Sequence, residues 1–128
     1  MNNDELKDRT NRFALRVTRL TESLPRKMTA DVLGRQVLRS GTSVAANYRS
    51  ACRAKSRADF ISKMGTVEEE ADETGLWLEL IGESGLLPAA KLDDLQREAD
   101  ELTAIAVQSI RTARARSATP LSALRDPQ

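Results

Sequence analysis

Histidine is absent from the 128 residues of this chain, and no other feature of the composition limits its chemistry as much. Histidine is the side chain that most often exchanges protons near neutral pH, and it is the commonest metal ligand. Glycine-rich phosphate loops, a nucleophile elbow and metal-ligand spacings are also missing from the sequence. We therefore expect a non-enzymatic protein with no catalytic residues, no bound metal and no cofactor.

Aromatic residues, cysteine and long apolar runs are also scarce. Phe, Trp and Tyr make up 3% of the chain, which is too few for a platform on which nucleic-acid bases stack. The single cysteine, Cys52, excludes an internal disulfide, and the lack of a long apolar run predicts no membrane span. The first residues, MNNDELKDRTNR, are too polar for a secretory signal. Together these features predict a cytoplasmic protein.

Proline is confined to four positions, and no stretch alternates β-branched with polar residues. Apolar residues instead recur every three or four positions in four segments, which is the pattern of amphipathic helices. The predicted stripes are Leu6, Phe13, Val17, Leu20 and Leu24; Leu33, Val37, Ser40, Val44, Tyr48 and Ala51; Phe60, Met64, Val67, Ala71, Thr74, Leu78 and Ile81; and Leu92, Leu95, Ala99, Leu102, Ala106, Ile110 and Ala113. The sequence therefore predicts an all-α protein, specifically an antiparallel up-down-up-down four-helix bundle.

The length and the extent of this periodicity predict the domain organisation. A chain of 128 residues fits one domain and buries about two-thirds of its unfolded surface. The periodicity ends near Ala115. We expect a four-helix bundle over residues 1–116 and a flexible C-terminal tail over residues 117–128.

Local signals predict where the first three helices begin and end. The first should stop before Pro25, because the residue that precedes a proline is pushed out of the α region. Thr29 is the predicted N-cap of the second helix. Ser56 followed by Asp59 resembles a capping box at the start of the third.

Glycine and proline predict the remaining boundaries. Gly82 and Gly85 should stop the third helix, and Pro88 fits the first turn of the fourth. Gly41 lies in the middle of the second helix, where glycine costs about 1 kcal/mol relative to alanine. We therefore expect a packing reason for Gly41.

Charge is distributed unevenly around the third helix. A basic set of five residues meets only Asp59: Arg49, Arg53, Lys55, Arg57 and Lys63. The residues from 64 to 83 then contain seven acids and no base: Glu68, Glu69, Glu70, Asp72, Glu73, Glu79 and Glu83. A near-neutral net charge of +1 therefore hides a local asymmetry that suits docking to a charged surface or to another copy of the chain.

The segment from Ser40 to Ile81 resembles a bacterial protein family first recognised in intervening sequences of large-subunit ribosomal RNA genes. The resemblance is carried by SVAANY at Ser43–Tyr48, by Ser56, by DF at Asp59–Phe60, by EADET at Glu70–Thr74 and by WL at Trp77–Leu78. This resemblance implies a four-helix bundle that assembles into a ring-like homo-oligomer, a pentamer, with a role in binding RNA. A similar protein of the same fold accompanies the reverse transcriptase of diversity-generating retroelements.

The basic set is the candidate nucleic-acid site. Repeated around a ring, these five side chains would form a collar that attracts phosphates by counterion release. Two alternatives remain open: a solvated helix end whose cations complement the helix dipole, and a surface for a partner protein. Arg111, Arg114 and Arg116 offer a second basic end, with the same alternatives.

Five further residues are candidates for the oligomer interface or for helix register. Glu70 and Glu73 should pair with arginines such as Arg39 or Arg49, within the chain or across a subunit boundary. The other three candidates are Asn47, Tyr48 and Trp77. Asn47 is predicted to be a buried residue that sets helix register, with a ligand contact as the alternative. Trp77 is favoured at a subunit contact over the core, because tryptophan is enriched in interfaces.

Two functions follow from these predictions. The first is a non-enzymatic oligomeric adaptor that binds RNA or DNA through the basic ends of the bundle. The alternative is a structural protein–protein interaction module with no nucleic-acid binding. The expected partners are further copies of the chain and RNA or DNA, with no membrane and no small-molecule substrate.

Overall fold

The computed structural model describes residues 1–116, and its regular elements there are all helical. The α-helices are α1 (Asn3–Glu22), α2 (Met28–Cys52), α3 (Arg57–Glu83) and α4 (Asp93–Ala115), and a short 3₁₀ helix, η1 (Ala89–Lys91), precedes α4. The all-α prediction is confirmed for this part of the chain, which contains four α-helices and no strand. The predicted tail, residues 117–128, lies outside the described residues.

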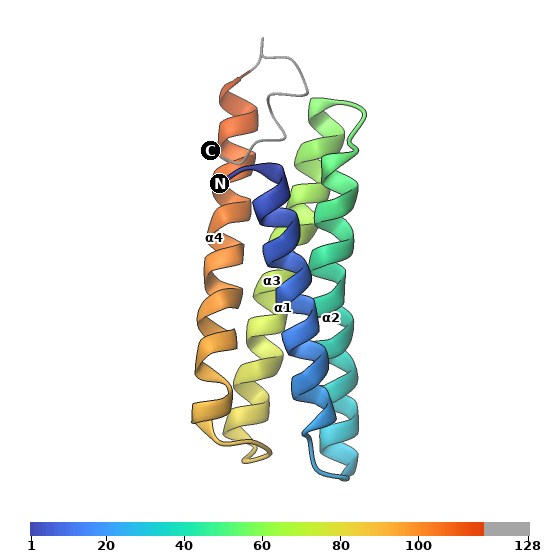
Figure 1. The fold of residues 1–128 in the computed structure, drawn as a ribbon, viewed down its shortest axis with the longest axis vertical. Coiled ribbons are helices and arrows are strands. Elements are labelled where there is room, and N and C mark those ends of the chain that lie inside the picture. The colour runs from blue at the N-terminus through green and yellow to red at the C-terminus, as the bar shows by residue number, and fades with distance from the viewer. Residues whose placement is uncertain (117–128) are drawn as a thin grey trace.

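The four helices lie side by side along their length (Figure 1). α1 packs on α2, α2 on α3 and α3 on α4, whereas α1 and α4 touch much less. The α1–α2 and α3–α4 connections lie at one end of the molecule, and the α2–α3 connection lies at the other (Figure 1). The seam between α1 and α4 is therefore the loosely packed side of the fold.

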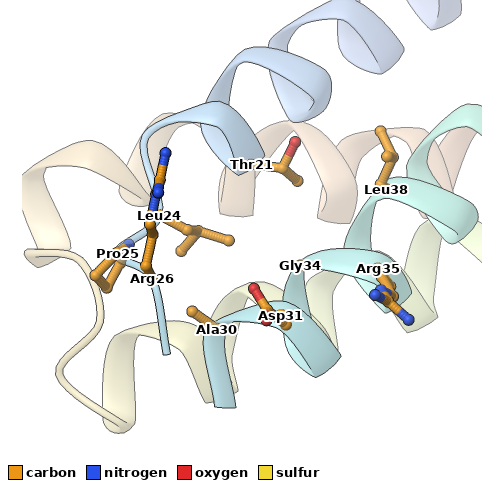
Figure 2. A pocket seen from close by; sticks show the side chains of 9 residues that line it. All are labelled: Thr21, Leu24, Pro25, Arg26, Ala30, Asp31, Gly34, Arg35 and Leu38. Carbon is orange, nitrogen blue, oxygen red and sulfur yellow. The ribbon is translucent and has the colours of Figure 1, made fainter. Parts of the chain in front are cut away.

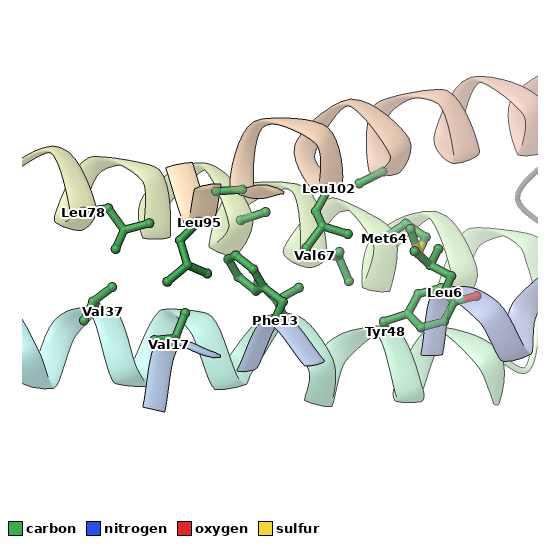
Figure 3. Close-up of a cluster of buried hydrophobic side chains, with 14 of the residues drawn as sticks. Leu6, Phe13, Val17, Val37, Tyr48, Met64, Val67, Leu78, Leu95 and Leu102 are labelled. Carbon is green, nitrogen blue, oxygen red and sulfur yellow. The ribbon is translucent and has the colours of Figure 1, made fainter. Parts of the chain in front are cut away.

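The core is built from the predicted stripes, several of whose members are shown in Figure 3. Every member of the α3 and α4 stripes is buried. The α1 and α2 stripes are buried as well, apart from Leu24 and Leu33, which are partly buried and pack against the core. Within this apolar interior, a hydrogen bond of 2.8 Å joins the hydroxyl groups of Ser40 and Thr74 and links α2 to α3.

Gly41 allows α1 and α2 to approach closely. A Cβ atom at this position would lie 2.9 Å from both Cγ atoms of Val17, closer than carbon atoms pack. The packing reason predicted for Gly41 is therefore confirmed.

The start of α3 follows the predicted signals, and its end follows Gly85 but not Gly82, which lies inside the helix. Ser56 is the N-cap, and its hydroxyl accepts the amide of Asp59 at 3.0 Å. Asp59 in turn accepts the amide of Lys55 at 3.1 Å, one residue before the position that a standard capping box uses. At the other end Gly85 has a φ of 74°, and the amide of Leu86 donates to the carbonyl of Ile81 at 3.1 Å, which is a Schellman arrangement.

The predicted start of α2 is wrong by two residues. Lys27, not Thr29, is the N-cap, and no side chain caps this end of the helix. The carbonyl of Lys27 already accepts the amide of Asp31 at 2.9 Å, so the helical hydrogen bonds begin there and Thr29 lies inside the first turn.

The predicted place of Pro88 is also wrong. Its carbonyl accepts the amide of Lys91 at 3.0 Å, which closes the 3₁₀ turn of η1. Leu92 then turns into the core with 4% of its surface exposed, and α4 starts at Asp93. Pro88 therefore precedes η1 and does not form part of the first turn of α4.

Candidate nucleic-acid interface

Three members of the basic set are exposed around the α2–α3 connection, at one end of the bundle. Arg49 lies in the last turn of α2, Arg53 is the C-cap residue of that helix, and Lys55 follows in the connection. The local fold favours cations here, because the carbonyl end of α2 carries a partial negative charge. These three residues can therefore meet an anionic partner without any rearrangement of the fold.

The other two members, Arg57 and Lys63, are half-buried. The Nη2 atom of Arg57 donates to the carbonyl oxygen of Arg116 at 3.0 Å, so this side chain ties the start of α3 to the end of α4. Lys63 lies six residues further along α3, away from the connection. The structure thus separates the five predicted cations into three exposed and two partly covered residues.

The second basic group lines a groove between α3 and α4. Arg111 and Arg114 are exposed on α4, and Glu68 and Glu69 of α3 line the same groove. Among the described residues none of these four forms an ion pair. Arg116 ends the described chain, and its carbonyl accepts the bond from Arg57.

Arg39 of α2 joins the two predicted glutamates of α3. Its Nη1 atom lies 2.9 Å from Glu70 Oε2, and its Nη2 atom contacts the carboxylate of Glu73. The Arg39 side chain is 50% exposed, so solvent screens both pairs and each contributes at most about 1 kcal/mol. Of the two arginine partners suggested by the sequence, Arg39 is thus the one that pairs within the chain.

Trp77 lies on the flank of the α3 stripe. It is half-buried against the core, and its indole N–H donates to the carboxylate of Glu73 at 3.0 Å. The preceding residue, Leu76, is 46% exposed. An apolar surface therefore remains beside Trp77 within the described structure, and its role at a subunit contact stays a prediction.

Asn47, unlike Tyr48, differs from the expected arrangement. Asn47 is half-buried rather than buried, and its Nδ2 atom donates to the carbonyl and the hydroxyl of Ser43 within α2, both at 2.9 Å. Within residues 1–116 it makes no hydrogen bond to a neighbouring helix, and a buried polar link between α2 and α3 is instead the Ser40–Thr74 pair. Tyr48 is 1% exposed, as its place in the predicted α2 stripe requires, and its role in helix register stays a prediction.

Residues 1–116 contain neither a cluster of metal-ligating side chains nor a membrane-spanning helix. No group of three or more His, Cys, Asp or Glu side chains in this range is placed to hold a metal ion. No helix in the range combines the length and the apolar character needed to cross a bilayer. Cys52 is half-buried at the end of α2.

The main polar link between α1 and α4, made by Arg9, could not be predicted from the sequence. Arg9 Nε lies 2.6 Å from Glu98 Oε2, Arg9 Nη2 lies 2.8 Å from Glu98 Oε1, and a third bond of 3.0 Å reaches Glu101. The hydrogen bonds to Glu98 are the main reason that the pKa of Arg9 is raised above its ordinary value. The partners are 89 residues apart in the chain, and no pattern in either helix pairs them.

A hollow at the α1–α2 connection was also not predicted (Figure 2). Leu24 and Pro25 line it from the connection, and Leu24 Cδ1 lies 3.0 Å from where a Cβ atom of Gly34 would be. Arg26, Arg35 and Asp31 are its charged residues, all of them exposed. The lining therefore combines apolar side chains with charged side chains that are exposed to solvent.

Comparisons with known proteins agree with this all-helical architecture. A family model described as 23S rRNA-intervening sequence protein matches residues 3–108. A similar solved structure is the crystal structure of a protein of unknown function from the S23 ribosomal protein family of Bacteroides thetaiotaomicron VPI-5482. The two chains are 35% identical with a TM-score of 0.77, and the match covers 82% of this chain and 97% of the other. No curated protein matches this chain.

Proposed function

This chain belongs to the 23S rRNA-intervening sequence protein family, and on that premise we propose that it is a non-enzymatic, oligomeric helical-bundle protein that binds RNA through its basic end. The observation that carries this proposal is the exposure of Arg49, Arg53 and Lys55 around one connection. Three cations in one subunit form a weak phosphate site. Several subunits with the same end facing the same way multiply the number of phosphate contacts and hence the affinity.

The proposed assembly is a ring-like homo-oligomer of antiparallel up-down-up-down bundles, and the family resemblance points to five subunits. The up-down order is supported by connections that alternate between the two ends of the molecule (Figure 1). Self-association is supported by apolar surface on α3, where Leu76 is exposed and Trp77 is half-buried. We place this assembly in the cytoplasm, with no metal, cofactor or small-molecule substrate.

Titration of a labelled single-stranded RNA with the protein, followed by fluorescence anisotropy, tests the RNA proposal. Binding should weaken by about tenfold or more between 50 and 200 mM salt, because phosphate contacts release counterions. Arg53→Glu combined with Lys55→Glu should reduce the affinity at low salt by at least about tenfold. Single-stranded DNA of the same sequence serves as a second ligand and shows whether the site distinguishes ribose from deoxyribose.

A matched control lies at the opposite end of the molecule. Arg26 and Lys27 are exposed in the α1–α2 connection, and reversing both charges changes the net charge by the same amount. The proposal expects this control to bind RNA nearly as well as the wild type. Equal losses in both variants would mean that only the overall charge matters.

A structural interaction module without nucleic-acid binding is the second candidate. The extensive acidic surface of α3, with eight acids against two bases, favours it, because such a surface repels phosphates. Undetectable RNA binding at low salt, in a protein that still forms oligomers, would establish this alternative.

A further inference from the structure

The fold places opposite charges on two sides of the bundle. α1 and α2 together carry eight bases and five acids, whereas α3 and α4 carry five bases and thirteen acids. Because α1 packs on α2 and α3 packs on α4, this difference separates two sides of the molecule. A contact between copies that sets the α1–α2 side of one against the α3–α4 side of the next is therefore electrostatically favourable.

Gly65 is an uncovered helical glycine on the acidic side. A Cβ atom at Gly65 would meet nothing within 4 Å, whereas one at Gly34, Gly41 or Gly82 would press on a leucine or valine side chain at 2.9–3.0 Å. Glycine destabilises the middle of a helix. At Gly65 no residue of the described chain packs closely enough to require a glycine. Close packing of another copy of the chain against Gly65 would explain why a glycine stands here.

Gly65 lies in the groove between α3 and α4, whose wall on α3 is acidic. Ile61 and Val107 add apolar surface to this groove, and Glu68 and Glu69 stand beside Gly65 on α3. Both glutamates lack an ion-pair partner within residues 1–116. The groove therefore suits a helix that has small side chains and a cation.

α2 presents such a surface on the basic side of the molecule. Ala45, Ala46 and Arg49 lie together at the edge of a shallow hollow shared with Asn11 of α1. Arg49 is exposed and forms no ion pair among the described residues. The two alanines allow another backbone to come close, and Arg49 supplies the charge that Glu68 and Glu69 lack.

The two surfaces lie at the same height along the bundle. Val37 lies across from Leu78, and Tyr48 lies across from Met64, so later residues of α2 face earlier residues of α3 (Figure 3). The hydrogen bond between Ser40 and Thr74 fixes this alignment. Arg49 follows Ser40 by nine residues and Gly65 precedes Thr74 by nine, so copies placed side by side need no axial shift to bring these residues together.

We propose that the Ala45, Ala46 and Arg49 surface of one copy packs into the α3–α4 groove of the next, over Gly65, with Arg49 between Glu68 and Glu69. The contact uses two different faces of the same chain. Such a heterologous contact closes into a ring when the rotation between neighbouring copies divides a full turn evenly. Because neighbouring copies are not shifted along the bundle axis, the assembly does not rise into a helical filament. This inference rests on the proposed self-assembly and identifies its contact. In the assembly it assigns Arg49 to that contact and leaves Arg53 and Lys55 as the exposed cations that meet RNA.

The second wall of the groove is basic and fits the same arrangement. When α2 of one copy faces α3 of the next, α1 of the first copy faces α4 of the next. Arg111 and Arg114 of α4 then lie on the side of Asp4 and Asp8, which belong to the first turns of α1. Along α2 the first copy supplies the cation and the next copy the acids, whereas along α1 the first copy supplies the acids and the next copy the cations. This alternation fixes the direction in which copies pair.

Multi-angle light scattering of purified full-length variants tests the proposed contact. Arg49→Glu alone, or Glu68→Arg with Glu69→Arg, should weaken assembly by at least about tenfold in dissociation constant. Combining all three changes in one chain should restore the wild-type mass, because the opposite charges face each other again. Gly65→Leu should also lower the mass, and circular dichroism should show unchanged helix content, since its side chain enters open space in the monomer.

Glu79→Arg with Glu83→Arg is the matched control, because it makes the same charge change elsewhere on α3. The control should retain the wild-type mass. An oligomer whose mass resists both Gly65→Leu and the Glu68/Glu69 reversal overturns this contact but leaves the proposed self-assembly intact. A monomeric wild-type protein overturns self-assembly itself, and the RNA titration, which uses Arg53 and Lys55, is judged separately.

Discussion

Gly41 and Gly65 show how one residue type serves two different purposes at the residue scale. Both lie in helix interiors, where glycine weakens the helix by about 1 kcal/mol relative to alanine. Gly41 faces Val17 at a distance that excludes a side chain, whereas Gly65 faces open space. The sequence reveals the presence of each glycine, but only the folded structure shows which one the monomer requires.

Alanine substitution should therefore shift stability in opposite directions at these positions. Gly41→Ala should lower the free energy of unfolding by about 1–3 kcal/mol, because overpacking against Val17 outweighs the gain in helix propensity. Gly65→Ala should raise it by about 1 kcal/mol. Urea denaturation at a concentration where the protein is monomeric measures both changes. Equal shifts in the same direction would contradict the close α1–α2 approach.

At the scale of elements, the helices and their buried faces could be predicted from periodicity alone. The α3 stripe from Phe60 to Ile81 is buried as predicted, because a regular spacing of three and four places all its members on one face. Helix starts were less predictable. Thr29 has the right chemistry for an N-cap, yet the helical hydrogen bonds already begin at Lys27. Backbone geometry in a turn depends on neighbouring helices, which a local pattern does not include.

The two helix starts differ in capping, and this difference can be measured. Ser56 caps α3 through its hydroxyl, whereas Lys27 offers α2 no cap. Ser56→Ala should lower the free energy of unfolding by about 1 kcal/mol, and Lys27→Ser should raise it by about 0.5–1 kcal/mol. Thermal denaturation of the two variants against the wild type provides the comparison. A neutral Lys27→Ser would show that the first turn of α2 cannot reach a serine hydroxyl.

At the scale of the whole molecule, the sequence indicated the charges but not their arrangement. Read along the chain, the basic set and the acidic residues that follow it suggested only a local asymmetry around the third helix. In the fold, the acids of α3 and α4 share one side, while Arg49 belongs to the other. The candidate site is predictable only in part for the same reason, since Arg57 turns toward Arg116 and Lys63 is half-buried.

Trp77 provides a test of assembly at this scale, because it is the only tryptophan in the chain. If it lies at a subunit contact, dilution to the monomer should shift its fluorescence emission to longer wavelength as water reaches the indole. Trp77→Ala should lower the oligomer mass, and Trp77→Phe, which keeps an aromatic ring, should largely retain it. Emission that stays constant while the mass falls on dilution would show that Trp77 lies outside the subunit contact.

The loosely packed seam between α1 and α4 has a consequence for how this molecule comes apart. Because α1 is held mainly by α2, with Arg9 as its principal tie to α4, detaching α1 breaks fewer contacts than detaching α2 or α3. Amide protons of α1 should consequently exchange with solvent through partial opening, before those of the central pair. The first helix is thus the part of the bundle that detaches most easily, and any ligand that bridges it to the last helix would oppose this opening.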